Sequence, residues 1–266
     1  MTSFLRIEAT DDRLLWRLPL TPAVCVGPPD NLFMYGGVGL GSAIHALEGA
    51  TGRPVIWATA QYLSYARPGS TVDLHVTVSV QGRRTSQARV IGRVGEEEIF
   101  VVAAALGGQG GGPSYQWVEP PQMPGPDDCA TSELWPDQGA NLNGRIELRM
   151  AQGRFGEGPR DGTISDDGRL VFWIRTREGF DLDASLLAVF ADYVPSGVGA
   201  ALGRPGGGSS LDNTLRIRTV TPTEWVLCDV QIKTVHGGIA HGAMNLFSQG
   251  GEFLATASQS MIVRTL

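Results

Sequence analysis

Alternating apolar and polar residues mark the clearest strand in this chain. Between residues 71 and 80, valine and leucine occupy every second position and polar residues fill most of the others. This period of two is typical of a half-buried antiparallel strand. Turns predicted at Gln81-Gly82 and at Gly95 separate it from two further apolar strands, over 85–94 and 98–106. We therefore expect a meander of long antiparallel strands.

A glycine-rich helix is predicted before these strands, over 32–50, with Gly52 closing it. The glycines at positions 36, 37, 39 and 41 superficially resemble a dinucleotide-binding loop. That motif needs a strand before it and an acidic residue about 20 positions later. Ile56-Trp57 stand at the later position. The pattern therefore argues against a nucleotide-binding fold.

A second helix is predicted to begin at Asp183, where apolar residues recur at spacings of three and four, at Leu186, Val189, Phe190 and Tyr193. The opposite row holds only small or polar residues, and Asp192 is one of them. Pro195 has no N–H to donate to the carbonyl of Ala191, so we expect the helix to bend at Asp192. Asp192 is thus a candidate site residue. The alternative is a solvated or capping aspartate.

The second half of the chain repeats features of the first half at a nearly constant distance. Pro68 and Pro222, Val72 and Val226, Gly82 and Gly237, and Gly95 and Gly250 are each separated by 154 or 155 positions. A constant offset carried by turns and strand phase indicates two copies of one unit. Each unit is a helix followed by antiparallel strands long enough to curl around it.

The segment between the two units has a different composition. Residues 107–143 contain GGQGGGP and EPPQMPGPDD, with few periodic apolar residues, as in a linker. We therefore predict an N-terminal unit over 1–106, a linker over 107–143 and a C-terminal unit over 144–266.

Composition and charge narrow the class of protein. Of 266 residues, 42% are hydrophobic and 18% charged, and the net charge is −6. This balance suits a globular protein and argues against a nucleic-acid surface. The three cysteines lie far apart, which favours reduced thiols in the cytoplasm and no metal site. We identify no signal peptide or membrane span and expect no cofactor.

Six motifs in order resemble one family. These are YGG at the first helix, the Arg-Pro-Gly turn, VFWIRTREGFDLD before the second helix, and then ADY, SSLDNTLRI with EWVL, and ATASQ. They resemble the acyl-CoA thioesterase II family. The resemblance implies an α+β fold, a tandem double hotdog in which two antiparallel sheets each wrap a long central helix. It also implies hydrolysis of acyl-CoA in lipid metabolism, and assembly into a homodimer or larger homo-oligomer.

The resemblance also implies a site. The family's aspartate, serine or threonine, and glutamine correspond to Asp192, Ser210 and Gln259, which would polarise a water for attack on the thioester without a covalent intermediate. A histidine that is common in the family's first repeat is missing here, where residues 58–61 read Ala-Thr-Ala-Gln.

The residues themselves support these assignments unequally. Gln259 shares a strand face with alanines and Met261, so its amide should be hydrogen-bonded. Ser210 falls out of phase with the inner face predicted from Leu211, Leu215 and Ile217, so either the strand starts after Ser210 or Ser209 serves instead. Amides at Gly36 and Gly37 are candidate donors to the substrate carbonyl, although both can equally be packing glycines.

Two alternatives stay open at this stage. One is a non-catalytic protein that binds acyl-CoA or acyl groups on the same fold. The other is a hotdog hydratase, which would need a histidine five positions after the helix aspartate. Gly197 occupies that position.

Overall fold

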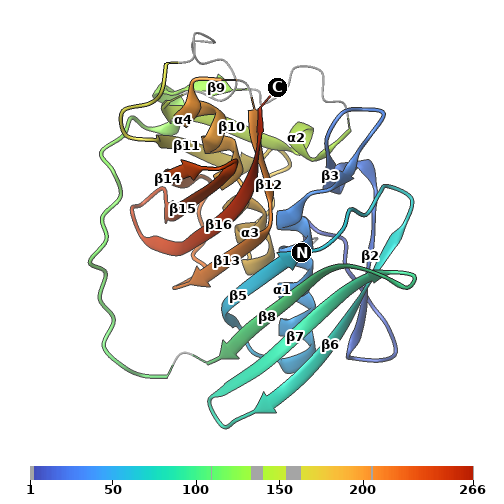
Figure 1. The fold of residues 1–266 in the computed structure, drawn as a ribbon. Coiled ribbons are helices and arrows are strands. Elements are labelled where there is room, and N and C mark those ends of the chain that lie inside the picture. The colour runs from blue at the N-terminus through green and yellow to red at the C-terminus, as the bar shows by residue number, and fades with distance from the viewer. Residues whose placement is uncertain (1–2, 109, 133–139, 154–162, 205, 266) are drawn as a thin grey trace.

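The computed structural model describes residues 3–108, 110–132, 140–153, 163–204 and 206–265. Most of its strands form one continuous antiparallel sheet, and two helical segments pack beside each other against the sheet (Figure 1). In the N-terminal half the sheet strands are β1 Glu8–Ala9, β2 Leu15–Pro19, β5 Val55–Tyr62, β6 Thr71–Gln81, β7 Thr85–Val94 and β8 Glu97–Gly107. In the C-terminal half they are β9 Ala130–Ser132, β10 Ile146–Gln152, β11 Arg169–Thr176, β12 Gly206–Ser210, β13 Asp212–Ile217, β14 Val226–His236, β15 Ile239–Ser248 and β16 Phe253–Thr265. The short strands β3 Cys25–Val26 and β4 Phe33–Met34 pair separately.

The order of the strands separates the two halves of the chain. The sheet runs β1-β2-β6-β7-β8-β5 and then β13-β16-β15-β14-β11-β10-β9, with β12 also beside β16. The halves meet where β5 pairs with β13. At this junction Thr59 stands opposite Thr214, and their hydroxyl oxygens are 2.7 Å apart. These two threonines are separated by 155 positions, which is the offset found in the sequence.

Irregularities of the sheet recur at the same offset. Val55 and Trp57 face the consecutive residues Leu106 and Ala105, which leaves Ile56 as an extra, bulged residue. In the other half, Ser210 faces Met261 and Thr214 faces Ser258, so this strand also carries one extra residue. Leu211, between β12 and β13, lies 155 positions after Ile56, and the two side chains are 41% and 40% exposed. A bulge moves every later residue by one step relative to its partner strand.

The first helix, α1, spans Gly36–Thr51. It starts later than predicted because Phe33 and Met34 pair with β3. It ends as predicted, at Gly52, whose φ of +66° is the left-handed geometry that glycine adopts without strain.

The second helix is broken at the predicted place. The segment α3 spans Ala184–Ala191 and is capped by Asp183, whose carboxylate accepts from Leu186 N at 2.7 Å. After Asp192 come the 3-10 turn η3, Val194–Ser196, and the short helix α4, Gly197–Leu202. Because Pro195 cannot donate to Ala191, the α-helical ladder stops and Asp192 sits at the break.

Contrary to the expectation from sequence, the stretch Ala184–Leu202 passes a test of length and apolar composition for a membrane-spanning helix. However, 78% of its most apolar 18-residue window is buried inside the protein. A core helix of a globular protein passes the same test, so this stretch is weak evidence for a membrane span.

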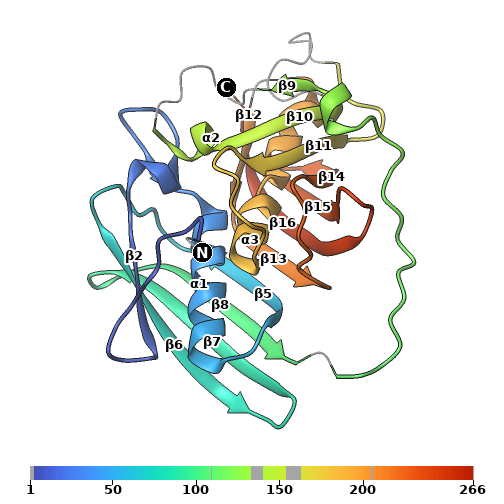
Figure 2. The same cartoon turned by 180° about the vertical axis from the view of Figure 1, so that it is seen from behind.

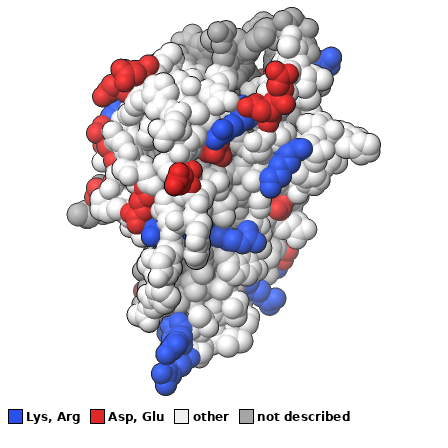
Figure 3. Space-filling view, turned by 90° about the vertical axis from the view of Figure 1, so that its left-hand side faces the viewer, with Lys and Arg blue, Asp and Glu red and all other residues white. Residues whose placement is uncertain are grey.

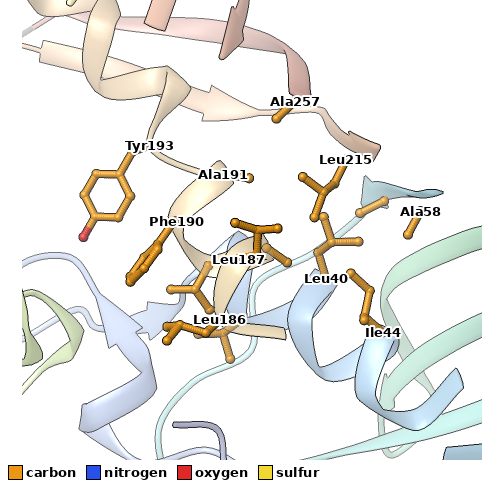
Figure 4. Packing of buried hydrophobic residues seen from close by; sticks show 14 of the residues in the cluster. Leu40, Ile44, Ala58, Leu186, Leu187, Phe190, Ala191, Tyr193, Leu215 and Ala257 are labelled. Carbon is orange, nitrogen blue, oxygen red and sulfur yellow. The ribbon is translucent and has the colours of Figure 1, made fainter. Parts of the chain in front are cut away.

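The two helices pack directly against each other. Figure 4 shows Leu40 and Ile44 of α1 near Leu186 and Leu187 of α3, with Leu215 and Ala58 of the two junction strands above them. Glycines allow the close approach, since a Cβ atom on Gly41 would lie 2.6 Å from the carbonyl oxygen of Ser185. The core is therefore continuous across the two halves. Figure 2 shows α1 and α3 side by side.

The predicted linker is shorter than the sequence suggested. Residues 108 and 110–125 cross between the halves without regular structure, but the 3-10 turn η2, Pro126–Asp128, and strand β9 follow, and β9 pairs with β10. A three-residue edge strand has no periodicity for a sequence pattern to detect. The crossing segment is anchored, because Pro124 accepts a hydrogen bond from Trp173 Nε1 at 2.9 Å.

Acidic and basic side chains are spread over the face drawn in Figure 3. Basic residues gather at its lower end and acidic residues alternate with basic ones above, with much uncharged surface between them. This view shows one face only.

Candidate functional site

A buried carboxylate marks the break between α3 and η3. The Asp192 side chain belongs to a residue that is only 4% exposed, and it accepts hydrogen bonds from three residues. Gly37 N donates to Oδ2 at 2.5 Å, and Asn213 Nδ2 donates to Oδ1 at 3.2 Å. Gln259 Nε2 also donates to Oδ1. The solvated alternative for Asp192 is therefore wrong, whereas a capping contact is present, because Gly37 lies in the first turn of α1.

Two of the donors come from neighbouring strands. Asn213 and Gln259 lie one residue before and one residue after the facing pair Thr214 and Ser258, so they stand opposite each other on β13 and β16. Both are buried, at 0% and 3% exposure. The sequence prediction that Gln259 is buried and hydrogen-bonded is confirmed.

Sequence analysis missed Asn213, although a signal was present. Asn213 has the same strand phase as Leu215, which is fully buried. A polar residue on an inner face requires a partner, so this phase could have identified it. Leu211, predicted to lie on that face, is instead bulged and exposed.

Ser210 does not contact the carboxylate by a hydrogen bond among the described residues. The bulge at Leu211 puts Ser210 opposite Met261, which is fully buried. Facing residues of an antiparallel pair project to the same side of the sheet. Ser210 therefore lies on the same side as Met261 and Gln259, opposite the residue two positions after Gln259 on β16. The expectation that the strand starts only after Ser210 is wrong, because Gly206–Ser210 already form β12. The extra residue Leu211 puts Ser210 on this side instead. Ser209 accepts a hydrogen bond from Arg264 at an exposed position, away from Asp192.

The two glycines of α1 lie against Asp192, and the Gly37 amide has a role different from the predicted one. The Gly37 amide, expected to bind a substrate carbonyl, is occupied by Asp192 Oδ2. A Cβ atom on Gly37 would lie 2.8 Å from Asp192 Cβ, so this glycine also packs. A Cβ atom on Gly36 would lie 2.8 Å from Asp192 Oδ2 and 3.1 Å from the Tyr62 hydroxyl. The N-terminal half thus contributes to the surroundings of Asp192, although the sequence placed all three catalytic candidates in the C-terminal half.

Burial changes the acidity of this site. Removal from water raises the pKa of Asp192 from 3.8 to about 7, although the hydrogen bonds from Gln259, Gly37 and Asn213 oppose the rise. A carboxylate with a pKa near neutrality can accept a proton from water and later return it.

Tyrosines surround the carboxylate. Burial, followed by the charge of Asp192, raises the pKa of Tyr35 and of Tyr62, and burial raises that of Tyr193. All three therefore remain neutral. Tyr62 shares the strand phase of Ala58 and Ala60, which are buried, so the period of two contained a signal for it that sequence analysis did not use.

We find no set of metal ligands in the part of the chain that the structure describes. There, no group of three or more histidine, cysteine, aspartate or glutamate side chains is arranged to hold an ion. The three cysteines are free and buried.

Comparison with known proteins identifies the family. A family model for the C-terminal domain of acyl-CoA thioesterases matches residues 126–263, about half of the chain. A solved structure from Novosphingobium aromaticivorans that carries a provisional thioesterase assignment is 35% identical, with a TM-score of 0.86, and the match covers 96% of this chain and 97% of that one. The chain belongs to the acyl-CoA thioesterase II family.

More distant structures support the fold of this thioesterase-family chain. A hotdog-fold protein of unknown function from Alicyclobacillus acidocaldarius is 18% identical, with a TM-score of 0.83 over 97% of this chain and 96% of that one. The acyl-CoA thioesterase II TesB2 of Mycobacterium marinum is 20% identical, with a TM-score of 0.74 over 99% and 97%. The fold is thus an α+β hotdog fold. A search of curated protein sequences gives no match.

Proposed function

We propose that this chain hydrolyses acyl-CoA thioesters to a free carboxylic acid and CoA, with Asp192 as the general base. The observation that carries the proposal is the buried carboxylate, held by three donors and with a pKa raised to about 7. The family resemblance implies that Asp192 polarises the water and that Gln259 helps to hold it, and the two residues are in contact here.

In the proposed mechanism the two oxygens of Asp192 differ. Oδ1 accepts from both Asn213 and Gln259, which fix the carboxylate, while Oδ2 accepts only from Gly37. Oδ2 therefore has the freer lone pair to take a proton from water as the water attacks the carbonyl carbon. We propose that the Ser210 hydroxyl binds this water, because Ser210 lies beside Gln259 on the neighbouring strand.

We also propose that the two halves are tandem copies of one hotdog unit. The support is the recurrence of the bulge at Ile56 and Leu211 and the facing of Thr59 and Thr214, all at an offset of 155. Assembly of whole chains into a homo-oligomer, a cytoplasmic location with reduced thiols, and a role in lipid metabolism are further proposals.

A panel of acyl-CoAs in a free-thiol assay tests the function. We expect thiol release from at least one chain length, and a loss of at least about 10²-fold in kcat for Asp192→Ala, because the general base is removed. Asp73→Ala is the matched control, since Asp73 forms an exposed pair with Arg17 and should leave activity unchanged. Tight binding of acyl-CoA without thiol release would support the non-catalytic alternative instead.

Two further variants in the same assay separate the roles of Asn213 and Ser210. Asn213→Ala removes a hydrogen bond that lowers the pKa of Asp192, so the pH at which activity reaches half its maximum should rise. Ser210→Ala should lower kcat without moving that pH. An unchanged rate in Ser210→Ala would remove Ser210 from the mechanism and leave Asp192 in it.

A further inference from the structure

Because the Gly37 amide donates to Asp192, the proposed reaction needs another donor for the thioester carbonyl oxygen. Thioester hydrolysis needs a hydrogen-bond donor at the carbonyl oxygen, which becomes negative as water attacks. Gly37 N donates to Asp192 Oδ2 and is no longer available for this task. At least one other donor beside the carboxylate is therefore required.

Four buried side-chain polar atoms among the described residues have no hydrogen-bond partner, and all belong to this region. They are the hydroxyls of Tyr62 and Tyr193 and the carbonyl oxygens of the Asn213 and Gln259 amides. Only the hydroxyls can donate. A buried donor without a partner is uncommon in a native protein, and a ligand that accepts from it is one explanation.

The surroundings of the two hydroxyls differ. The ring of Tyr193 contacts Tyr35 and Phe172, with centroids 5.8 and 6.0 Å away. Figure 4 shows that its hydroxyl points away from Leu215 and Ala257, the neighbours of Asn213 and Gln259 along their strands. The Tyr193 hydroxyl therefore does not point toward the strands that carry Asn213 and Gln259.

Tyr62 lies close to the Asp192 oxygen that accepts from Gly37. The point where a Cβ atom would stand on Gly36 is 3.1 Å from the Tyr62 hydroxyl and 2.8 Å from Asp192 Oδ2. The hydroxyl and the proposed basic oxygen thus border one small region. Any side chain at position 36 would meet both atoms, so glycine is required for this close approach.

We infer that the Tyr62 hydroxyl donates a hydrogen bond to the thioester carbonyl oxygen while Asp192 Oδ2 takes the proton of the attacking water. This inference rests on the proposed function. The water oxygen bonds to the carbonyl carbon, its proton passes to Asp192, and the π electrons move to the oxygen that Tyr62 faces. Collapse then breaks the carbon–sulfur bond, and the CoA thiolate takes the proton back from Asp192.

Tyr62 keeps its own proton throughout this sequence. Burial and the nearby Asp192 raise its pKa well above the ordinary value, although the Asn213 side chain beside it opposes the rise. Tyr62 therefore acts as a donor and never as a base. It comes from β5 of the N-terminal half, whereas Asp192 lies in the C-terminal half. Both halves therefore supply a group that meets the reacting atoms.

The first test is Tyr62→Phe, which removes only the hydroxyl. We expect kcat to fall about 10²-fold, as for the loss of one oxyanion donor, with KM changed by less than about threefold. The half-maximal pH set by Asp192 should not move. Tyr65→Phe is the matched control, because this tyrosine is 59% exposed and packs against Phe33. Wild-type kcat in Tyr62→Phe overturns the inference.

A second measurement does not depend on turnover. In the Asp192→Asn background, a thioester labelled with carbon-13 at the carbonyl should show its C=O stretch at lower wavenumber when bound than in water, and adding Tyr62→Phe should reverse that shift. An unchanged stretch, together with a moved half-maximal pH, would mean that Tyr62 only positions Asn213 and would overturn the inference.

These readouts also separate the two proposals. If the wild-type chain binds acyl-CoA but releases no thiol, hydrolysis is wrong, and the carbonyl stretch still decides for or against Tyr62. If no acyl-CoA binds, both proposals are overturned.

Discussion

At the scale of residues, the protein concentrates its unusual chemistry on one side chain. Burial makes the charged form of Asp192 unfavourable, and three hydrogen bonds offset only part of that penalty. The result is a base with a pKa close to neutrality, which a solvated aspartate with its ordinary pKa near 4 cannot be. The same burial that tunes the base also destabilises the fold at high pH.

The stability of the protein should therefore depend on pH through Asp192. Because the folded-state pKa is raised to about 7, the folded protein holds this proton more tightly than the unfolded chain does. The contribution to the free energy of unfolding is greatest below about pH 4, falls between pH 4 and 7, and stays low above pH 7.

The variant Asp192→Asn tests this sign. We expect it to be inactive and, at pH 8, more stable than wild type by about 2–4 kcal/mol, with little difference at pH 4. The new amide fits, because its oxygen can accept from Gly37 N while the amides of Asn213 and Gln259 rotate to accept its hydrogens. Urea denaturation at both pH values provides the measurement. Equal stabilisation at both pH values would contradict the raised pKa.

At the scale of elements, the site depends on how closely α1 and α3 approach. Gly37 and Gly41 form a row one turn apart on α1, and each faces backbone atoms of α3. This contact lets an amide of α1 reach the carboxylate at the end of α3. The break at Pro195 then turns Asp192 away from a regular helical position.

Substituting the two glycines at the start of α1 should give different results. A Cβ atom in Gly37→Ala would lie 2.9 Å from Val189 Cα and 3.0 Å from the Ala188 carbonyl oxygen. Backbone atoms move little, so we expect a loss of about 1–3 kcal/mol in the free energy of unfolding.

Gly36→Ala serves as the comparison for that experiment. Its Cβ atom would meet the Asp192 carboxylate and the Tyr62 ring rather than α3 backbone. We expect activity to fall with a smaller loss of stability, because alanine also favours the helix. Thermal melts and the thiol assay on both variants distinguish the effects. A Gly37→Ala protein as stable as wild type would show that the helices can separate freely.

At the scale of the whole molecule, the proposed tandem repeat explains why only one half carries the carboxylate. Gly37 and Asp192 are separated by the repeat offset of 155 and face each other. At the same offset, Ala58 and Ala104 face each other in register where the other half has Asn213 and Gln259. Since a Cβ atom at Gly37 would lie 2.8 Å from Asp192 Cβ, two such aspartates cannot coexist.

A chain break in the crossing segment tests whether the halves act as one body. Gly110 and Gly111 contact nothing within 4 Å of a built Cβ atom, whereas the halves share the β5–β13 ladder and the helix contact. Residues 1–111 and 112–266, expressed together, should copurify and retain activity within about a factor of ten, because one core joins them. Each part alone should be inactive. An active C-terminal part would show that Gly37 and Tyr62 are dispensable.

Much of this architecture was determined by local pattern in the sequence. Alternation located the long strands, the recurring turns indicated the repeat, Pro195 located the helix break, and the face of β16 placed Gln259 inside. Each of these follows from periodicity or backbone chemistry over a few residues, and the sequence contains that information directly.

Only the tertiary structure decided which residues donate hydrogen bonds to Asp192. The bulge at Leu211 selects Asn213 rather than Ser210 as the strand partner, and the contact of α1 with α3 brings the Gly37 amide across 155 positions. Strand register and the distance between helices depend on the packing of the entire core, as does the desolvation that raises the pKa of Asp192. No short stretch of sequence specifies them.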